Sequence, residues 1–578
     1  MSAAEREVLR VGNCSGFYGD RLSAMREMLE GGELDVLTGD WLAELTMLIL
    51  GRDRLKDPDT GYARTFLVQL RDCLGLALEK GVTIVANAGG VNTPGLVSAI
   101  RELATEQGLS PRVAHVRGDD LTPRAAALDL GRPMGAHAYL GGFGIARAVD
   151  SGADIVVTGR VTDASVIVGP AIAHFGWGRE DLDALAGATA AGHVIECGTQ
   201  ATGGNYAFFT EIDNFSHLGF PLAEIRRDGS SIITKHPGTG GAVTVDTIKS
   251  QLLYEIADAR YPGPDVTTRL DTIVLAQDGP DRVSMTGIRG EAPPPDVKVS
   301  LNALGGFRNE MTMVLTGLDI RAKAELVQRQ FEEELTTSPA EMTWTLARTD
   351  RPDAPTQQQA AALLTVVARD SDPKVVGRPF SQAGIDIALG TYPGCHTLAP
   401  PSGGSPYGVF TPGYVPQSVP EHEVVLDDGT VVAVGPPQRT QALEPLTGQP
   451  AAANPAPTGW PTTTAPLGTI AGARSGDKGG HANVGVWVRD AAAWPWLSAL
   501  LTPERIRQLL PEAADLPVTV THLPNLLAVN IVVHDLLGEG VAYNARFDPQ
   551  AKGLGEWLRS RHVDIPDHLL PSPPEDHR

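Results

Sequence analysis

The stretch from Asp154 to Pro170, DIVVTGRVTDASVIVGP, turns from apolar to polar within what begins as a buried strand. Arg160 and Asp163 follow the apolar run, with Thr162 between them. An arginine fork suits a carboxylate or phosphate, and a neighbouring carboxylate can move protons. We therefore predict that Arg160 and Thr162 bind an anionic substrate and that Asp163 is a catalytic base.

Polar residues and glycines also follow four earlier apolar runs. They are Cys14 and Ser15 after the first run, Asp40 after the second, Asn87, Gly89, Gly90 and Asn92 after the third, and Asp119 and Asp120 after the fourth. Ligands of open parallel sheets bind beyond the carboxyl ends of the strands, where such residues meet. We expect Cys14, Ser15, Asn87 and Asn92 to bind substrate. Asp40 is the alternative base, and the Gly89 and Gly90 amides are expected to receive a developing oxyanion.

Each of these residues also has a structural interpretation. Thr162 or Asp163 can cap the helix that follows, as such residues often do. Arg160 can form a structural salt bridge with one of the nearby acids, Asp40, Asp119 or Asp120. The stretch ANAGGVNTPG matches neither the dinucleotide nor the ATP fingerprint, so it predicts only the binding of an anion or a carbonyl group.

A second polar stretch, GHVIECGTQATGGNY, places His193, Glu196 and Cys197 close together. Their spacing does not match HExxH, so we expect no metal site. A catalytic cysteine or an acid/base group is one interpretation, and a buried cysteine beside a tight glycine turn is the other. Three residues of the same stretch are expected to bind substrate: Gly203, Gly204 and Asn205.

Near the carboxyl end, GARSGDKGGHANVGV is the densest polar turn of the chain. A merely connecting hairpin needs little more than two glycines. We therefore predict a functional turn that binds an anion or docks onto the first lobe. Ser475 and Asp477 are expected to bind substrate, and Lys478 is expected to close the site as a catalytic residue.

The elements that must position these residues alternate between strand and helix from Glu7 to about Gly178, as in a mainly parallel sheet with right-handed crossovers. We predict an α/β core over residues 1–178, with helices on both faces of the sheet, and an α+β second lobe over 179–447. The Pro/Ala/Thr-rich residues 448–466 predict an extended linker. Residues 467–578 predict a small α+β domain of ferredoxin-like shape.

Composition excludes several classes of function. The 578 residues are 42% hydrophobic and 20% charged, with a net charge of -22 that disfavours nucleic acid and anionic membranes as partners. Four separated cysteines without a CxxC pair indicate reduced thiols. The sequence MSAAEREVLRVG has no apolar run of the signal-peptide type, and no segment has the length of a membrane span. We expect a cytoplasmic homo-oligomer.

Several long motifs resemble the acyclic terpene utilisation A family: NCSGFYGDRLSAM, LTGDWLAELTM, ANAGGVNTPG, GADIVVTGRVTDASVIVGPAIAHFGW and HVIECGTQATGGNYAFF. The segment ARSGDKGGHANVGV resembles the small ferredoxin-like domain that this family carries either fused or as a separate partner. The resemblance covers nearly the whole chain. It implies a role in the bacterial breakdown of acyclic terpenes, such as citronellol and geraniol, and of branched acids through acyl-CoA intermediates.

For the reaction, we expect a lyase or hydro-lyase that adds or removes water beside a carbonyl of a small carboxylated or CoA-linked substrate. Carboxylates, an arginine and amide-rich loops suffice for proton transfer and enolate stabilisation. No nicotinamide, flavin, pyridoxal phosphate or ATP fingerprint is visible, so no cofactor is expected, although CoA can be part of the substrate. One alternative is a non-catalytic metabolite-binding or scaffold subunit of an acyl-CoA-processing complex. Another is a hydrolase that uses Cys14 or Ser15 as its nucleophile.

Overall fold

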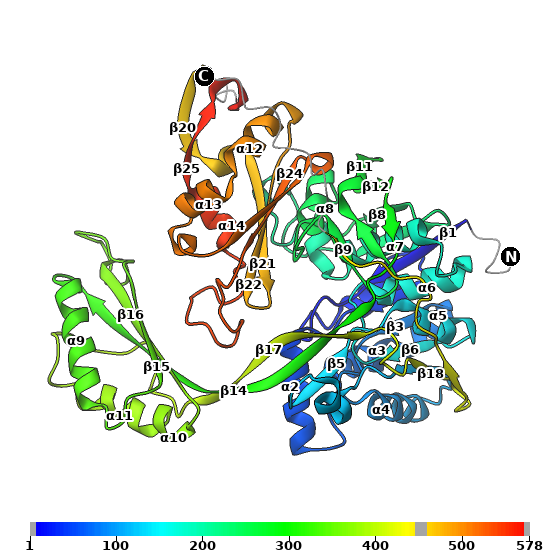
Figure 1. Ribbon diagram of the computed structural model, residues 1–578, viewed down its shortest axis with the longest axis horizontal. Helices are drawn as coiled ribbons and strands as arrows, with labels where there is room; N and C mark the ends of the chain where they lie inside the picture. The colour runs from blue at the N-terminus through cyan, green and yellow to red at the C-terminus, as the bar shows by residue number, and fades with distance from the viewer. Residues whose placement is uncertain (1–6, 445–458, 572–578) are drawn as a thin grey trace. The chain divides into compact units, whose positions relative to one another are not determined.

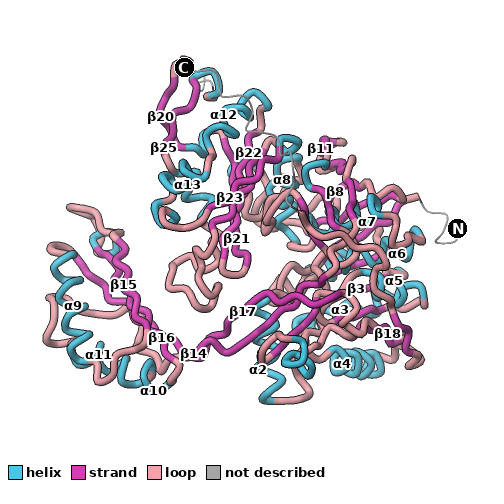
Figure 2. Tube along the Cα trace, viewed as in Figure 1, coloured by secondary structure: helices cyan, strands magenta, loops and turns pink. Residues whose placement is uncertain are grey.

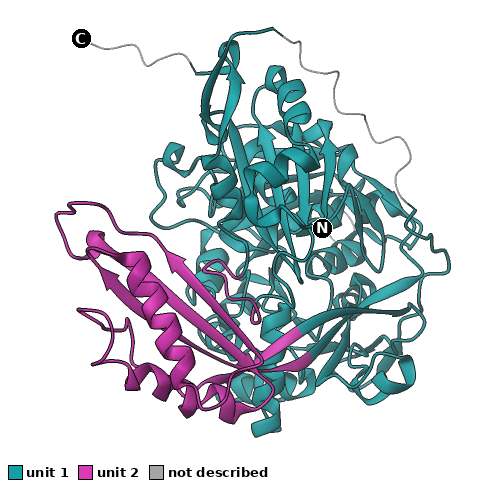
Figure 3. Cartoon of the chain, turned by 60° about the vertical axis from the view of Figure 1, so that its left-hand side comes forward, with its two compact units in different colours: residues 1–302, 410–541, 550–578 teal, residues 303–409, 542–549 magenta. Residues whose placement is uncertain are grey.

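The computed structural model describes residues 7–444 and 459–571 (Figure 1). The chain divides into two compact units, shown in different colours in Figure 3. The first unit comprises residues 1–302, 410–541 and 550–578, and the second comprises 303–409 and 542–549. Residues 448–458 of the predicted linker lie outside the described residues. The second unit is an insertion within the stretch predicted as one α+β lobe.

The first unit is built on a mixed sheet with the strand order β11-β12-β8-β7-β1-β2-β3-β6-β4-β18-β19. Its centre is parallel and consists of β1 (Val8–Asn13), β2 (Val36–Gly39), β3 (Thr83–Ala86), β6 (Ile155–Thr158) and β4 (Val113–Arg117). The antiparallel flanks are β7 (Pro221–Arg226), β8 (Ser231–Lys235), β11 (Val274–Gln277), β12 (Val283–Thr286), β18 (Glu423–Val425) and β19 (Val431–Ala433). The predicted α/β fold is confirmed, with the five predicted parallel strands adjacent in one sheet.

Helices cover both faces of the parallel centre because its strands are apolar on both sides. Successive residues of a strand point to opposite faces, so Ile84 packs into one core and Val85 into the other. The first core contains residues of α1 (Ala24–Gly31), α3 (Arg64–Lys80) and α4 (Thr93–Glu106). The second contains residues of α5 (Gly142–Asp150), α6 (Ser165–Phe175) and α7 (Leu182–Ile195).

Small residues allow α7 to pack closely against its neighbours. A Cβ on Gly187 would lie 2.1 Å from the Gly229 carbonyl oxygen, and one on Gly192 would lie 2.8 Å from Ala164 Cβ. Side chains at these positions would push the helix away from the sheet and from α6. The run of Gly and Ala therefore fixes where the carboxyl end of α7 lies, and that end carries His193.

Other strands of the first unit lie beside the large sheet. β9 (Arg260–Pro262), β10 (Thr267–Arg269) and β13 (Arg289–Glu291) form a small sheet, and β5 (Gly135–Ala138) pairs with the first part of β14 (Asp296–Thr316). α2 (Glu44–Lys56) follows β2, and α8 (Val245–Leu252) follows β8.

The second unit is entered through β14 and left through β17 (Ser405–Pro416). Its sheet has the order β15-β16-β14-β17, with β15 at Glu341–Ala347 and β16 at Ala361–Asp370. Three helices belong to it: α9 (Ile320–Glu334), α10 (Pro373–Val376) and α11 (Arg378–Asp386). Phe331 and Phe380 stack edge to face at 5.2 Å in its core, a geometry that aromatic pairs favour.

The carboxyl-terminal part of the first unit forms an antiparallel sheet of order β21-β22-β24-β23, visible in Figure 2. Its strands are β21 (Ala471–Lys478), β22 (His481–Val488), β23 (Val518–Leu523) and β24 (Ala528–Val533), and its helices are α12 (Trp494–Leu500), α13 (Pro503–Leu509) and α14 (Leu554–Ser560). The predicted small α+β domain is confirmed. β20 (Thr462–Pro466), predicted as linker, instead pairs with β25 (His562–Pro566), since its threonines suit a strand.

Candidate functional site

The carboxyl ends of the central parallel strands bring predicted site residues together. Asp40 follows β2, Asn87 follows β3 and Arg160 follows β6. The Asn87 Nδ2 donates a hydrogen bond to Asp40 Oδ1, and Arg160 Nη1 donates to the Leu42 carbonyl oxygen at 3.0 Å. The predicted polar edge therefore exists as one connected set of contacts.

Arg160 is buried, with 2% of its surface exposed, yet it is incompletely paired. Its Nη1 donates to Asp163 Oδ1 at 2.8 Å, and its guanidinium stacks over the Tyr139 ring at 4.3 Å. Its backbone N–H donates to Asp119 Oδ2 at 2.8 Å. The buried Nε has no hydrogen-bond partner among the described residues. The guanidinium thus pairs with Asp163, which was predicted as the base, and keeps a donor unused.

A second cation approaches the same aromatic ring. The Lys298 ammonium of β14 lies 4.6 Å from the centre of the Tyr139 ring, and the Tyr139 hydroxyl donates to Glu44 Oε1 at 2.9 Å. Lys298 Nζ is 3.6 Å from the same oxygen. Burial alone would raise the pKa of Glu44, but the charges of Lys298 and Arg160 outweigh it and lower that pKa to about 2. Glu44 is therefore ionised at neutral pH and interacts with both cations, Lys298 and Arg160.

The carboxyl end of α7 contributes an imidazole and a carboxyl group. His193 Nδ1 lies 3.3 Å from Glu196 Oε1, and both side chains are buried. Asn13 at the end of β1 fixes this turn, because its Nδ2 donates to the carbonyl oxygens of Ile195 at 2.8 Å and Glu196 at 2.9 Å. Both ring nitrogens of His193 and the Oε2 of Glu196 lack a hydrogen-bond partner in the described part of the chain.

The carboxyl-terminal domain supplies residues from β21. Lys478 Nζ donates to the Glu255 carbonyl oxygen at 2.9 Å. Arg474 donates to Gln200 Oε1 and stacks over the Tyr254 ring at 4.2 Å. Lys478 and Arg474 thus contact residues of the stretch predicted as the second lobe and not the predicted docking partner, the first, and Lys478 is the last residue of a strand.

We name these side chains the buried ionisable cluster. Its members are the carboxyl groups of Asp40, Glu44, Asp163, Glu196, Glu255 and Asp477, the cations of Arg160, Lys298 and Lys478, and the imidazole of His193. All belong to the first unit; Asp40, Arg160, His193 and Glu196 are buried, and the other six are partly exposed. The carboxyl groups outnumber the cations, so not all of them can ionise cheaply in a buried place.

Burial and like charge shift the protonation of the cluster toward neutral forms. Burial, with the charge of Asp163, raises the pKa of Asp40 and of Glu196 well above its usual range. Burial also raises the pKa of Asp163, against the opposing effect of Arg160, and lowers the pKa of His193 to about 4. Carboxylic acids and a neutral imidazole therefore lie beside carboxylates, which is the equipment of general acid–base chemistry.

Other predicted site residues have their polar groups engaged within the chain. The Gly89 amide donates to the Thr158 carbonyl oxygen at 2.9 Å, so it cannot receive an oxyanion as predicted. Asn92 caps α4, since its side chain accepts from Gly95 N at 3.1 Å. The Thr162 hydroxyl forms a hydrogen bond with the hydroxyl of Ser165, the first residue of α6. Of these contacts only that of Asn92 is a helix cap. α6 has no side-chain cap, so the capping interpretation of Thr162 and Asp163 is wrong, and Asp163 pairs with Arg160 instead.

The remaining predicted binding residues lie in turns or in the small domain. Gly90 has φ 54°, Gly203 has φ 111° and the exposed Asn205 has φ 58°, which are left-handed turn conformations. The Gly204 amide donates to the Thr199 carbonyl oxygen at 2.9 Å. Ser475 Oγ donates to the Lys552 carbonyl oxygen at 3.0 Å, within its own domain. Their contact with substrate stays a prediction.

The geometry of Cys14 and Ser15 does not favour a nucleophile. Cys14 is buried, and burial, with the charge of Asp20, raises the pKa of its thiol well above the usual range. A reactive cysteine needs the opposite shift. The Ser15 hydroxyl is buried and donates to the Phe17 carbonyl oxygen at 3.0 Å, whereas an activated serine donates to a base.

Several members of the cluster were not assigned from the sequence. His193 and Glu196 were weighed, and their separation of three residues at a helix end was the available signal. Glu44, Glu255 and Lys298 gave no signal, because they reach the cluster from α2, from the turn after α8 and from β14. Only the tertiary fold brings those segments together.

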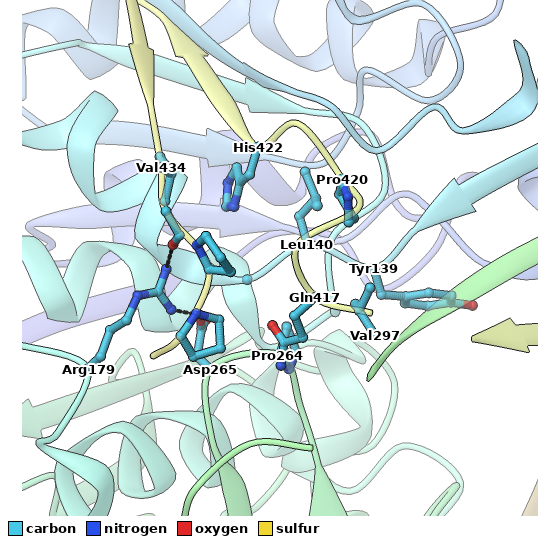
Figure 4. Close-up of a pocket in the computed structure, with 14 residues that line it drawn as sticks. Tyr139, Leu140, Arg179, Pro264, Asp265, Val297, Gln417, Pro420, His422 and Val434 are labelled. Carbon is cyan, nitrogen blue, oxygen red and sulfur yellow. Dashed lines mark hydrogen bonds and ion pairs between the residues drawn. The ribbon is translucent and has the colours of Figure 1, made fainter. Parts of the chain in front are cut away.

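A separate cavity lies beside Arg179, with an internal volume of about 30 Å³ (Figure 4). Arg179 stacks over Phe143 at 4.2 Å and donates to the Gly435 carbonyl oxygen at 2.5 Å, and its Nη1 lies 3.5 Å from Asp265 Oδ1. Asp265 Oδ2 also accepts from the Gly142 amide at 2.6 Å, at the start of α5. The charges here satisfy each other, and the space fits no more than a few waters. His422 also lines this cavity, and its buried Nε2 has no hydrogen-bond partner among the described residues. Four such atoms lie in the buried ionisable cluster: Arg160 Nε, both ring nitrogens of His193 and Glu196 Oε2.

Two further searches concern the described residues alone. Within residues 7–444 and 459–571, no three His, Cys, Asp or Glu side chains are grouped so that they could hold a metal ion. In the same ranges, no helix combines the length and the apolar character needed to cross a membrane.

Comparison with known proteins covers most of the chain in two stretches. Residues 9–426 match the family model described as acyclic terpene utilisation family protein AtuA. Residues 465–564 match the AtuA ferredoxin-like domain. No curated protein matches the chain at a significant level. The family model spans the strand ends, α7 and β14, and the domain model spans Lys478, so the chain belongs to the acyclic terpene utilisation AtuA family and carries the family's ferredoxin-like domain on the same chain.

Proposed function

We propose that the chain is a lyase or hydro-lyase of acyclic terpenoid or branched-acid catabolism. Its substrate is a small carboxylated or CoA-linked acid, and the reaction adds or removes water beside the carbonyl. The family supports the metabolic setting. The chemistry is supported by the buried ionisable cluster, whose side chains are suited to proton transfer.

The observation that carries this proposal is the unpaired buried polar atoms of the cluster. Arg160 Nε, both nitrogens of His193 and Glu196 Oε2 have no hydrogen-bond partner among the described residues. Each such atom costs about 1–3 kcal/mol when it is left unsatisfied. A bound molecule can supply their partners, and a substrate with a carbonyl or carboxylate acceptor and a hydroxyl group suits a donor beside two proton-transfer groups.

On this proposal, Arg160 Nε donates to the carbonyl or carboxylate oxygen of the substrate and stabilises the negative charge that develops on it. Asp163 or Asp40, as carboxylate, removes the proton from the carbon next to the carbonyl. That C–H bond breaks as the carbon–carbon double bond forms. The neighbouring C–O bond then breaks, Glu196 gives its proton to the departing hydroxyl, and water leaves. Hydration is the reverse sequence.

The side chains of the cluster suffice for these steps. Arg160 supplies the positive charge, and the carboxyl groups supply both the base and the acid. The proposal therefore names no cofactor, and CoA enters only as part of the substrate. Lys478 comes from the ferredoxin-like domain. It adds a cation to the cluster at the point where its ammonium group binds the Glu255 carbonyl oxygen.

The test is turnover by the purified full-length protein in ²H₂O. The panel holds 2-enoyl-CoAs and 3-hydroxyacyl-CoAs with straight and 3-methyl-branched chains, together with the corresponding free acids. Mass spectrometry follows the gain or loss of 18 Da and the incorporation of one deuterium at the carbon beside the carbonyl. The proposal expects both changes for at least one branched member.

Arg179→Ala is the matched control for Arg160→Ala. Arg179 is also stacked on an aromatic ring and paired with an aspartate, but outside the cluster. The proposal is supported if Arg160→Ala loses turnover and Arg179→Ala keeps it. Tight binding of a panel member without any mass change would replace it with the metabolite-binding or scaffold function. Release of a free acid from the CoA esters, blocked by thiol alkylation, would replace it with the hydrolase.

A further inference from the structure

Glu255 has a backbone conformation that is unusual for its residue type. It lies three residues after the end of α8, with φ 57°, in the left-handed region that glycine prefers. The sequence pattern predicts that the helix continues through this segment. Instead the chain turns at Glu255, and non-glycine residues held in this region often belong to functional sites.

Two buried asparagines of the ferredoxin-like domain hold this turn. The Glu255 N–H donates to Asn483 Oδ1 of β22 at 2.7 Å. Asn483 Nδ2 donates to Asn530 Oδ1, and Asn530 Nδ2 donates to the carbonyl oxygens of Ile256 at 3.3 Å and Ala257 at 3.2 Å. Both asparagines are almost completely buried, with 0% and 1% of their surfaces exposed. The backbone of three consecutive residues is therefore bound by one side-chain pair.

Glycines of β21 and β22 allow the close approach. A Cβ on Gly476 of β21 would lie 2.4 Å from Tyr254 Cε2, and one on Gly485 of β22 would lie 2.4 Å from Leu253 Cβ. Both distances are far shorter than a van der Waals contact. The small domain thus presents a face without side chains at these points, shaped to fit the segment before Glu255.

The side chain of Glu255 belongs to the buried ionisable cluster. Its charge acts on Glu196 and His193, and it is itself affected by Glu44 and Asp163. Lys478, another member of the cluster, donates to the backbone carbonyl oxygen of the same residue at 2.9 Å, so the turn itself contacts the cluster.

We propose that the ferredoxin-like domain is a positioning element of the active site: Asn483 and Asn530 hold Glu255 in its left-handed conformation, so that its carboxyl group serves as a further acid/base group of the cluster. Asn483 and Asn530 are positioning residues, and Glu255 is the catalytic residue that they orient. The acid/base role rests on the proposed function, while the positioning does not. If the ferredoxin-like domain completes the active site in this way, the site needs that domain whether it lies on the same chain or on a separate partner chain.

Asn525 offers a matched control in the same domain. Its Nδ2 donates to the carbonyl oxygens of Leu270 and Ile273, both at 2.9 Å, so it also docks the small domain through backbone carbonyl groups. In the described part of the chain, its side chain makes no hydrogen bond to residues 253–257. Asn525→Ala therefore removes a docking interaction of the same kind without releasing Glu255.

Hydrogen–deuterium exchange of the full-length protein tests the positioning without reference to activity. In Asn483→Ala, the amides of the peptide containing residues 254–258 should exchange at least tenfold faster than in the wild type. Asn525→Ala should leave that peptide unchanged. If Asn483→Ala does not accumulate as folded protein, Asn530→Ala releases the same segment and takes its place. If residues 254–258 exchange at the same rate in Asn483→Ala or Asn530→Ala as in the Asn525→Ala control, the positioning role is overturned.

Glu255→Gln and Glu255→Gly test the catalytic role on the CoA-ester panel in ²H₂O. Both should lose at least a hundredfold in kcat with little change in KM, and Glu255→Gly should not lower Tm because glycine adopts this conformation freely. Asn483→Ala should lower kcat, and Asn525→Ala should not. Unchanged kcat in Glu255→Gln would overturn the acid/base role. A wild-type protein that turns over no panel member would overturn the proposed function instead, and the exchange data would still decide the positioning.

Discussion

His193 Nδ1 and Glu196 Oε1 lie 3.3 Å apart at the carboxyl end of α7, and each group is pushed toward its uncharged form. Burial lowers the pKa of His193 to about 4 and, with the charges of Asp163 and Glu255, raises that of Glu196 well above its usual range. A carboxylic acid therefore stands beside an imidazole that is free to accept a proton. The uncharged carboxyl group holds a proton that it can give, whereas the uncharged imidazole has a nitrogen without one. Two neighbouring groups whose pKa values are shifted apart from each other's usual order are a common way for one site to provide both an acid and a base.

Glu196→Gln should abolish proton donation while preserving the fold. The amide has the shape of the protonated carboxyl group, which is the form that this buried place favours, but it cannot release a proton to a leaving hydroxyl. We expect turnover of the responsive CoA ester to fall by about 10²–10⁴-fold. Tm at pH 8 should stay the same or rise. Turnover within threefold of the wild type would exclude Glu196 as the acid.

The stability of the protein should depend on Asp477 between about pH 4 and pH 7. Burial, with the charges of Glu255 and Glu44, raises the pKa of Asp477 from 3.8 to about 7. A carboxyl group whose pKa is raised on folding stabilises the fold fully below its unfolded pKa, and that contribution is lost as the pH rises through the folded value. Asp477→Asn keeps a neutral group throughout and escapes this loss.

We therefore expect Asp477→Asn and the wild type to have nearly equal Tm at pH 4. At pH 8, the variant should be more stable, by at least about 2 °C. Thermal unfolding followed by circular dichroism at both pH values measures the difference. A variant that is less stable at pH 8 would show that the carboxylate is favourably paired, contrary to its place in an acidic cluster.

Removing Arg160 alone should cost stability as well as activity, because it leaves the buried Asp40 and the partly exposed Asp163 without the cation that most favours their charged forms. Breaking a buried ion pair from one side typically costs about 3–5 kcal/mol. The double variant Arg160→Gln/Asp163→Asn removes both charges, so most of the lost Tm should return while turnover stays absent. A double variant as unstable as Arg160→Gln alone would show that Arg160 is held mainly by its bond to the Leu42 carbonyl oxygen.

Gly485→Ala should loosen the docking of the ferredoxin-like domain. The new Cβ would lie 2.4 Å from Leu253 Cβ, an atom bound directly to the backbone, so the strand or the turn must move. Overpacking of this kind commonly costs about 1–3 kcal/mol. Limited proteolysis should then cut the chain between its two family regions faster than in the wild type. Gly390→Ala has no atom within 4 Å of its new Cβ and is the matched control.

The sequence allowed the parallel centre of the fold to be predicted because short apolar strands and helices alternate with clear boundaries. It also pointed to Asp40, Asp163 and Arg160, since the carboxyl ends of parallel strands meet by geometry. In the antiparallel flanks, the stretch RLDTIVLAQDGPDRVSMTGIRG predicts two strands joined by a polar turn, and these are β11 and β12. The hairpin β7–β8 was not foreseen, because it adds to an edge without any periodic signature.

Glu255 shows why the rest of the site was hidden. Apolar periodicity in VTVDTIKSQLLYEIADARY predicts one long helix, but α8 ends at Leu252. Its end is decided by two asparagines more than two hundred residues away in sequence, at Asn483 and Asn530. Tertiary contacts of this kind override local propensity, and they leave no pattern in the segment on which they act.

The most direct measurement is a crystal structure of the full-length protein with 3-methylbut-2-enoate, a branched unsaturated acid. The account predicts a carboxylate oxygen within about 3.2 Å of Arg160 Nε, with the double bond of the acid directed toward Glu196 and Asp163. An acid bound elsewhere, with Arg160 Nε bonded to a protein group, would contradict the assignment of the buried ionisable cluster as the active site.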